Sequence, residues 1–208
     1  VTPFNTFNDN NYRGIEVQSL GKIIANNLTA TDNGNTGAYL YNPNGTGTII
    51  VYTKDKNALG AFDSNTSWGI YAISSRNIML KNISATLNGD AGAYLNNCLV
   101  SSDVCSGAGS ITLTSAYGLV NTFSSNQKFG LWMSTGGNVN ITDIHADANG
   151  LGGWYVKNAY SGTSGNVTLK ASKNVTNTFL TNVWASPSYL AGVMDPRFYG
   201  LEIYSNGH

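Results

Sequence analysis

Glycine and asparagine recur along this chain at fixed distances from each other. From Gly130, nineteen residues lead to Asn149, and four more lead to Gly153. The same two steps occur from Gly14 through Asn33 to Gly37, and from Gly69 through Asn88 to Gly92. A fixed period is typical of repeat architectures, in which each repeat packs mainly on its two neighbours. It therefore limits the possible folds more than any single residue does.

Seven glycines and seven asparagines keep this spacing. The glycines are Gly14, Gly37, Gly69, Gly92, Gly130, Gly153 and Gly200. The asparagines are Asn10, Asn33, Asn65, Asn88, Asn126, Asn149 and Asn182. Successive glycines are 23, 32, 23, 38, 23 and 47 residues apart. The spacing predicts bare 23-residue coils that alternate with coils carrying loop insertions.

The residues one and three positions after each of these glycines are apolar in all seven repeats. They are Ile15, Val17, Ala38, Leu40, Ile70, Ala72, Ala93, Leu95, Leu131, Met133, Trp154, Val156, Leu201 and Ile203. Strict alternation predicts a strand with one buried face. In the bare coils the later apolar positions change once from a spacing of two to a spacing of three, as at Val139, Ile141, Ile144 and Ala146. That change indicates a corner.

These patterns predict an all-β fold, a parallel β-helix (solenoid) of about seven coils with three short strands per coil. We expect a single domain over residues 1–208, with double-coil repeats at about 14–61, 62–121 and 122–177. Stacked coils lie about 4.8 Å apart. At that spacing, asparagines at one corner can form an amide ladder, in which each side chain bonds to those above and below.

Two segments carry a resemblance to known repeats. Residues 137–141 read Gly-Asn-Val-Asn-Ile, and residues 92–95 read Gly-Ala-Tyr-Leu. They resemble the right-handed parallel β-helix repeats of large secreted bacterial surface proteins of the adhesin type, and the likeness extends over nearly the whole chain. The resemblance implies a right-handed solenoid outside the cell. It implies little about activity, because this architecture carries lyases, hydrolases, adhesins and passive stalks.

Charge and hydropathy exclude several classes of protein. Eleven Lys and Arg residues balance eleven Asp and Glu residues, and charged residues make up 11% of the chain. Nucleic-acid binding needs a basic surface, so we expect no nucleic-acid partner. No apolar run reaches the length of a membrane span. The chain starts at Val1 without a Met or a signal segment, so we expect a processed or excised piece.

Cys98 and Cys105 both lie in the insertion between Gly92 and Gly130. We expect a disulfide that closes a protruding loop, and with it an extracellular or cell-surface location. A metal site is the alternative, but it would need further Cys or His ligands nearby.

The pattern breaks between Asn182 and Gly200, where about fourteen extra residues are inserted. This apolar insert, residues 184–197, should pack on the solenoid wall or on another chain. Neither end of the chain resembles a polar solenoid cap. If a second copy followed the first, Gly200 would lie eighteen residues before its Asn10, close to the nineteen of an intact coil. We therefore expect either a piece of a longer array or end-to-end self-association through Val1–Asn10 and Gly200–His208.

The outward position two residues after the glycine is aromatic in five successive coils. These residues, the aromatic column, are Tyr39, Tyr71, Tyr94, Trp132 and Tyr155. One interpretation is a stack of rings that stabilises the solenoid. The other is a binding surface, either for the sugar rings of an extracellular polysaccharide or for a neighbouring filament.

Acids and histidines are too scattered to predict catalysis. A lyase or glycosidase of this fold needs clustered carboxylates, and Asp143 and Asp147 lack a nearby acid to pair with. We expect both to be solvated surface charges. His145 lies at an outward position without a Ser or Cys nucleophile. We therefore expect no catalytic residue, no metal site and no cofactor.

Two functions remain as hypotheses. The first is a non-enzymatic extracellular structural protein, a rigid solenoid that forms or belongs to a surface stalk, adhesin or filament. The alternative is a carbohydrate-binding module, or a polysaccharide lyase or hydrolase of the parallel β-helix type. Low charge and the lack of acid clusters favour the first.

Overall fold

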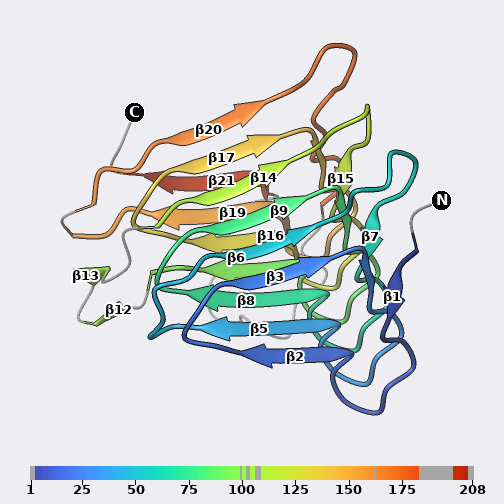
Figure 1. The fold of residues 1–208 in the computed structure, drawn as a ribbon. Coiled ribbons are helices and arrows are strands. Elements are labelled where there is room, and N and C mark those ends of the chain that lie inside the picture. Colours follow the sequence, from blue (N-terminus) through green and yellow to red (C-terminus); the bar gives the residue numbers. More distant parts are fainter. Residues whose placement is uncertain are drawn as a thin grey trace, which may run out of the picture.

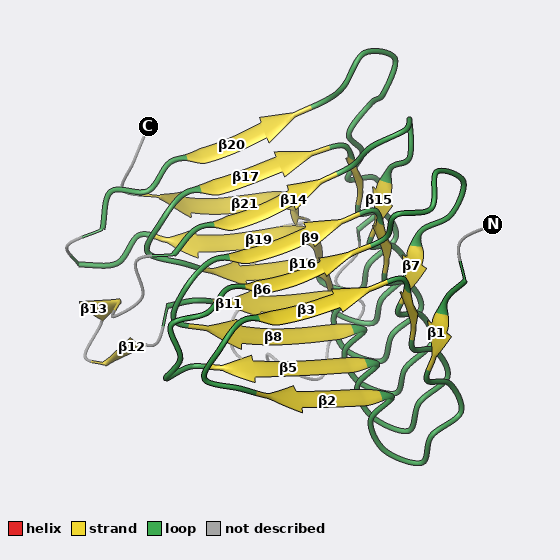
Figure 2. Ribbon diagram, viewed as in Figure 1, coloured by secondary structure: helices red, strands yellow, loops and turns green. Residues whose placement is uncertain are grey.

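The computed structural model describes residues 3–98, 100–101, 104–105, 109–161, 163–182 and 199–205. Within these residues the chain forms strands and turns, without a helix, and winds through three parallel sheets (Figures 1 and 2). The prediction of a parallel β-solenoid with three strands per coil is confirmed.

A complete coil passes through the three sheets in the order B, C, A. Sheet B contains β2 (Ile15–Gln18), β5 (Ala38–Asn42), β8 (Ile70–Ser74), β11 (Ala93–Asn96), β16 (Phe129–Ser134), β19 (Gly152–Asn158) and β21 (Tyr199–Ser205). Sheet C contains β3 (Ile23–Asn26), β6 (Ile49–Tyr52), β9 (Ile78–Lys81), β14 (Ile111–Thr114), β17 (Val139–Thr142) and β20 (Val167–Lys170). Sheet A contains β1 (Asn5–Thr6), β4 (Leu28–Thr29), β7 (Gly60–Ala61), β10 (Ile83–Ser84), β15 (Asn121–Thr122) and β18 (Ile144–His145).

The register of the parallel strands follows the repeat spacing. Ala93, the residue after Gly92, pairs with Ile70 on one side and Leu131 on the other. Because side chains alternate along a strand, this register keeps every inward position in line with its equivalents in the neighbouring coils.

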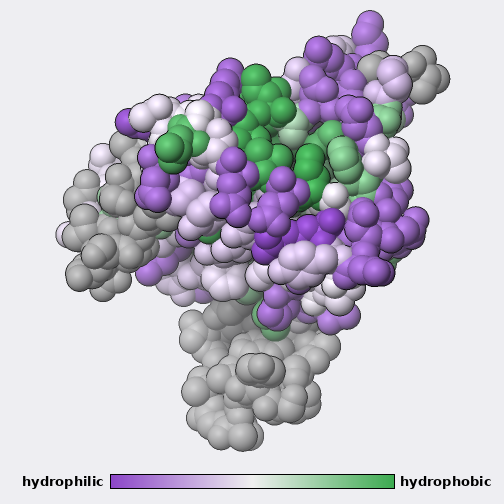
Figure 3. All heavy atoms as spheres, turned by 60° about the horizontal axis from the view of Figure 1, so that its bottom comes forward, coloured by the Kyte–Doolittle hydropathy of each residue, from purple (hydrophilic) through white to green (hydrophobic). Residues whose placement is uncertain are grey.

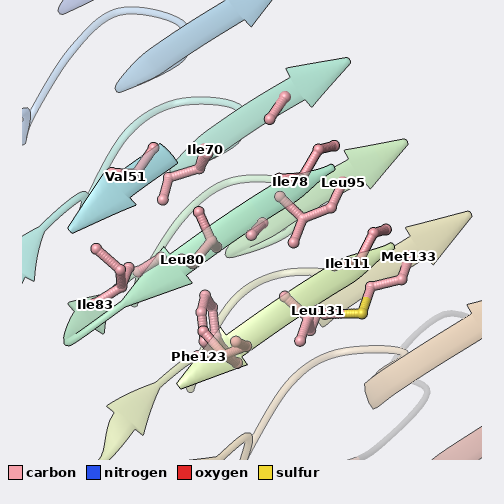
Figure 4. Packing of buried hydrophobic residues seen from close by; sticks show 14 of the residues in the cluster. Val51, Ile70, Ile78, Leu80, Ile83, Leu95, Ile111, Phe123, Leu131 and Met133 are labelled. Carbon is pink, nitrogen blue, oxygen red and sulfur yellow. The ribbon is translucent and has the colours of Figure 1, made fainter. Parts of the chain in front are cut away.

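One continuous core runs along the inside of the solenoid. Leu95 and Met133 from sheet B meet Ile78 and Ile111 from sheet C (Figure 4). At the end of sheet A, large and small side chains alternate, with Ala85 in the coil between those of Phe62 and Phe123, and all three are buried. This alternation lets each phenylalanine use the space left by the alanines above and below it.

The structure divides each insertion between two corners. One insert lies between sheets B and C, around Pro43–Gly45, in the cysteine loop and around residues 159–164. There the antiparallel pair β12 (Val100–Ser101) and β13 (Val104–Cys105) forms, and Cys98 and Cys105 form a disulfide. A second insert lies between sheets C and A, in loops 53–59, 115–120 and 171–177. The repeat pattern did not indicate these three loops. The apolar insert at 184–197 lies outside the described residues.

Candidate functional site

The corner between sheets A and B, here called the ladder corner, repeats one set of hydrogen bonds in successive coils. The backbone N and the Nδ2 of each repeat asparagine donate to the Oδ1 of the asparagine in the next coil. For Asn88 the two distances to Asn126 Oδ1 are both 3.0 Å. The chain of bonds runs unbroken from Asn10 to Asn182. Its members from Asn33 onward are buried.

The ladder explains the glycine column. A Cβ on Gly92 would lie 2.5 Å from the Ala85 carbonyl oxygen, 2.6 Å from the Gly130 carbonyl oxygen and 2.9 Å from Asn126 Nδ2. Two of these atoms are backbone, so they cannot move aside without disturbing the stack. Glycine is therefore required for close approach at this position, and not for a positive φ.

The ladder corner also holds backbone in the left-handed region. The residue before each ladder asparagine has a φ between 50° and 59°, and the set is Asp9, Asp32, Ser64, Leu87, Ser125, Ala148 and Thr181. Asp tolerates this conformation, whereas leucine and threonine adopt it at a cost of about 1–2 kcal/mol. The stacked asparagines therefore impose one corner conformation whatever residue precedes them.

The aromatic column lies on the outer face of sheet B, with each ring partly exposed. Tyr71 is stacked between two tyrosines, with ring centroids 5.1 Å from Tyr39 and 4.9 Å from Tyr94, and with interplanar angles of 2° and 12°. Trp132 lies edge to face with Tyr94 and Tyr155, at 67° and 73°. Both faces of the Tyr71 ring thus lie against neighbouring rings, which is the geometry of a stabilising stack.

Residues outside the five predicted positions enlarge the column. Trp68 lies tilted 4.9 Å from Tyr71, and Phe129 lies 5.3 Å from Trp132. Both stand directly before repeat glycines, a position that the search for alternating apolar residues did not include. At one end of the column the Arg13 guanidinium lies 3.8 Å from the centroid of Tyr39. Arg13 also forms an ion pair with Glu16 at 2.6 Å.

Two phenols of the column, those of Tyr71 and Tyr155, have a raised pKa. Desolvation, together with the neighbouring Tyr94 and Tyr39, raises the pKa of Tyr71 to about 12. Desolvation and the nearby Glu202 carboxylate raise the pKa of Tyr155. Burial in the column therefore favours the neutral phenols of Tyr71 and Tyr155.

The expectation that Asp143 is a solvated surface charge is wrong. Asp143 is 2% exposed, and its carboxylate accepts hydrogen bonds from the Ser115 hydroxyl and from the hydroxyl and backbone N of Ser172. Burial raises the pKa of Asp143, but these hydrogen bonds outweigh it and hold the pKa below its usual value. Asp147 accepts similar bonds, from the Thr178 hydroxyl and the backbone N of Leu180, both at 2.6 Å. Both acids thus link adjacent coils.

The remaining predicted site residues are not brought together. His145 is half-buried, with its Nε2 3.2 Å from the carbonyl oxygen of Thr176. Among the described residues, no group of three His, Cys, Asp or Glu side chains is arranged to hold a metal ion. The same part of the chain contains no helix that is long and apolar enough to cross a membrane.

Lysines and an exposed tyrosine gather where the loops between sheets C and A project. This loop corner contains Lys54, Lys56 and Tyr117. The repeat pattern does not indicate it, because these residues stand in insertions, outside the repeating positions. The one available signal was local, the two lysines within Thr-Lys-Asp-Lys at residues 53–56.

Comparison with protein-family models, with curated proteins and with solved structures gave no match to this chain. The likeness to secreted bacterial repeats therefore rests on the repeat pattern alone. The structure shows the parallel β-solenoid fold.

Proposed function

We propose that this chain is a non-enzymatic extracellular structural protein, a rigid β-solenoid that forms or belongs to a surface stalk, adhesin or filament. The observation that carries the proposal is the unbroken ladder from Asn10 to Asn182 together with one continuous core. Each coil bonds to the next through the same atoms. Bending the rod would strain many of these contacts at once, so stiffness follows from the fold.

Two further observations support this function. The disulfide between Cys98 and Cys105 is typical of proteins in oxidising compartments, including the cell exterior. The carboxylates of Asp143 and Asp147 accept hydrogen bonds from neighbouring coils, so they stabilise the stacking of the coils.

End-to-end association with a second copy extends the proposal. At the β2 end, Ile15 and Val17 line a hollow of about 370 Å³ together with Ile23 and Leu28. Figure 3 shows this end, where apolar side chains form one patch with hydrophilic residues around it. At the β21 end, the equivalent inward residues Leu201 and Ile203 are 37% and 42% exposed. A second copy placed in register would cover both surfaces and add strand pairing.

Electron microscopy and sedimentation of the purified chain test this proposal. We expect rods one solenoid wide, with an axial repeat of about seven coils, or roughly 34 Å. Replacing Ile15 and Val17 by lysine should abolish the rods, since it places charge in the apolar contact. The control is Met79→Lys, because Met79 points outward from sheet C in a middle coil, is 41% exposed and does not line the hollow. A chain that stays monomeric at high concentration would contradict end-to-end association.

A further inference from the structure

The three loops between sheets C and A form a row along one edge of the solenoid. Loops 53–59, 115–120 and 171–177 follow β6, β14 and β20, and all three project on the same side in Figure 1. They belong to alternate coils, so neighbouring loops are two coils apart, about 10 Å. The loop corner is thus a periodic edge rather than a single protrusion.

Each loop is anchored in the same way to the coil before it. The backbone N–H of the second loop residue donates to the side-chain Oδ1 of a corner residue in the preceding bare coil. Lys54 N donates to Asn27 at 2.9 Å, Ala116 N donates to Asn82 at 2.8 Å, and Ser172 N donates to Asp143 at 2.5 Å. All three corner residues are left-handed, with φ of 47°, 55° and 55°. The loops are therefore held in fixed positions, which lowers the entropic cost of binding a ligand.

Positive charge accumulates on this edge although the chain has no net charge. The lysines on or beside the three loops are Lys54, Lys56, Lys81, Lys170 and Lys173. The two carboxylates of the same corner, Asp55 and Asp143, are 6% and 2% exposed. The salt bridges found among the described residues, Arg13–Glu16 and Lys128–Asp90, lie elsewhere. The edge therefore presents ammonium groups to solvent and keeps its acids inside.

An exposed aromatic ring stands among these lysines. Tyr117, at the tip of loop 115–120, is 57% exposed. The Nζ atoms of Lys56 and Lys81 lie 5.7 and 5.9 Å from its ring centroid, and Lys54 Nζ lies 5.7 Å from the ring of Tyr52. Unlike the rings of the aromatic column, the Tyr117 ring has no aromatic partner among the ring contacts of the described residues. It is thus available to a ligand.

An acidic polysaccharide combines the two features that this edge can recognise. Its pyranose faces pack on aromatic rings, and its carboxylates pair with ammonium groups. A spacing of about 10 Å between loops is comparable to a disaccharide in an extended chain. We propose that the loop corner, centred on Tyr117, Lys56 and Lys81, is a binding site for an acidic polysaccharide. The site shares no residue with the aromatic column, and it does not depend on end-to-end association.

Binding of polygalacturonate oligosaccharides to the purified chain, measured by calorimetry, tests the proposal. We expect binding that weakens with increasing ionic strength and that is lost with fully methyl-esterified oligosaccharides. The double variant Lys56→Gln/Lys81→Gln should weaken binding roughly tenfold, as expected when two ammonium groups are lost. Tyr117→Ala should weaken it similarly, and Tyr117→Phe should retain it, because the ring face and not the hydroxyl is the contact.

The matched control is Lys22→Gln/Lys128→Gln, which removes the same charge from exposed positions outside the loop corner. It should leave binding within about twofold of the parent chain, since screening weakens distant charges. Equal loss in the control and the loop-corner variant would overturn the proposal, because net charge alone would then explain binding. Absence of binding to polygalacturonate by the parent chain, or unchanged binding by the Tyr117→Ala and double lysine variants, would also overturn it.

Discussion

The ladder corner and the loop corner, which flank sheet A, differ in how regular their residues are from coil to coil. At the ladder corner, each repeat asparagine follows a residue with left-handed backbone, and the asparagine side chains bond inside the stack. At the loop corner, alternate coils differ in length and composition, and the side chains of Lys54, Lys56 and Tyr117 are exposed. This difference indicates that the ladder corner, where the coils are alike, stabilises the solenoid. The loop corner, where the coils differ, is available for the binding proposed above.

Substitution at the glycine column should have the largest effect. Gly92→Ala places a Cβ within 2.6 Å of two carbonyl oxygens, so a backbone shift must spread into the neighbouring coils. We expect a loss of about 3 kcal/mol or more in the free energy of unfolding. Gly21→Ala is the control, because the nearest atom to its Cβ would be Ser19 Oγ at 3.6 Å. Chemical denaturation of both variants checks the difference.

Breaking the ladder at its middle should cost almost as much. Asn88→Ala removes the Oδ1 that accepts from the backbone N and Nδ2 of Asn65. The backbone N is then buried without this acceptor, whereas Nδ2 keeps its bond to the Ala30 carbonyl oxygen at 3.0 Å. The expected loss is about 2–3 kcal/mol, because an unsatisfied buried donor costs about 1–3 kcal/mol and a second hydrogen bond is lost as well. Asn10→Ala, at the exposed end of the ladder, should cost less than about 1 kcal/mol. Equal losses at the two positions would contradict a ladder that stabilises through burial.

The aromatic column should show its contribution at high pH. Tyr71 has a pKa of about 12 in the folded chain, against about 10 in the unfolded chain. A pKa raised by folding stabilises the protein below the unfolded value, and this contribution disappears as the pH rises through the folded value. The free energy of unfolding should therefore decrease between pH 10 and 12. This decrease should be smaller in Tyr71→Phe, as chemical denaturation at each pH would show. Tyr71→Ala should cost about 1–2 kcal/mol at neutral pH through lost ring contacts.

Relief of backbone strain at the ladder corner should stabilise the chain. Leu87 is 63% exposed and has a φ of 59°. Its left-handed backbone therefore costs free energy that burial of the side chain does not offset. Leu87→Asn should raise the free energy of unfolding by about 1 kcal/mol, because asparagine adopts this conformation more easily. A destabilised variant would mean that the leucine makes contacts that outweigh the strain. Thermal denaturation of Leu87→Asn and of the parent chain distinguishes these two outcomes.

Changes at the loop corner should have the smallest effect on stability. The Lys56→Gln/Lys81→Gln variant alters exposed or half-exposed side chains, and its unfolding free energy should stay within about 0.5 kcal/mol of the parent. A large loss of stability would remove the contrast between the two corners, and would assign these lysines a structural role.

The fold was predictable from the sequence because a solenoid repeats its constraints. Strict alternation after each glycine and the fixed step to asparagine identified sheet B, the core and the corner where the ladder forms. The loops between sheets C and A were not predictable, because inserted residues have no equivalents in the bare coils. Asp143 was misjudged for a related reason: its hydrogen-bond donors, Ser115 and Ser172, belong to neighbouring inserted coils and stand outside the repeat.

Hydrogen exchange followed by mass spectrometry, with and without polygalacturonate, tests the division between the two corners most directly. In the free chain we expect the backbone amides of Asn65, Asn88 and Asn126 to exchange slowest, since they are buried and donate within the ladder. Added polygalacturonate should slow exchange in loops 53–59 and 115–120 and leave the ladder unchanged. Ladder amides that exchange as fast as the loops, or protection by the ligand at another face, would contradict the account.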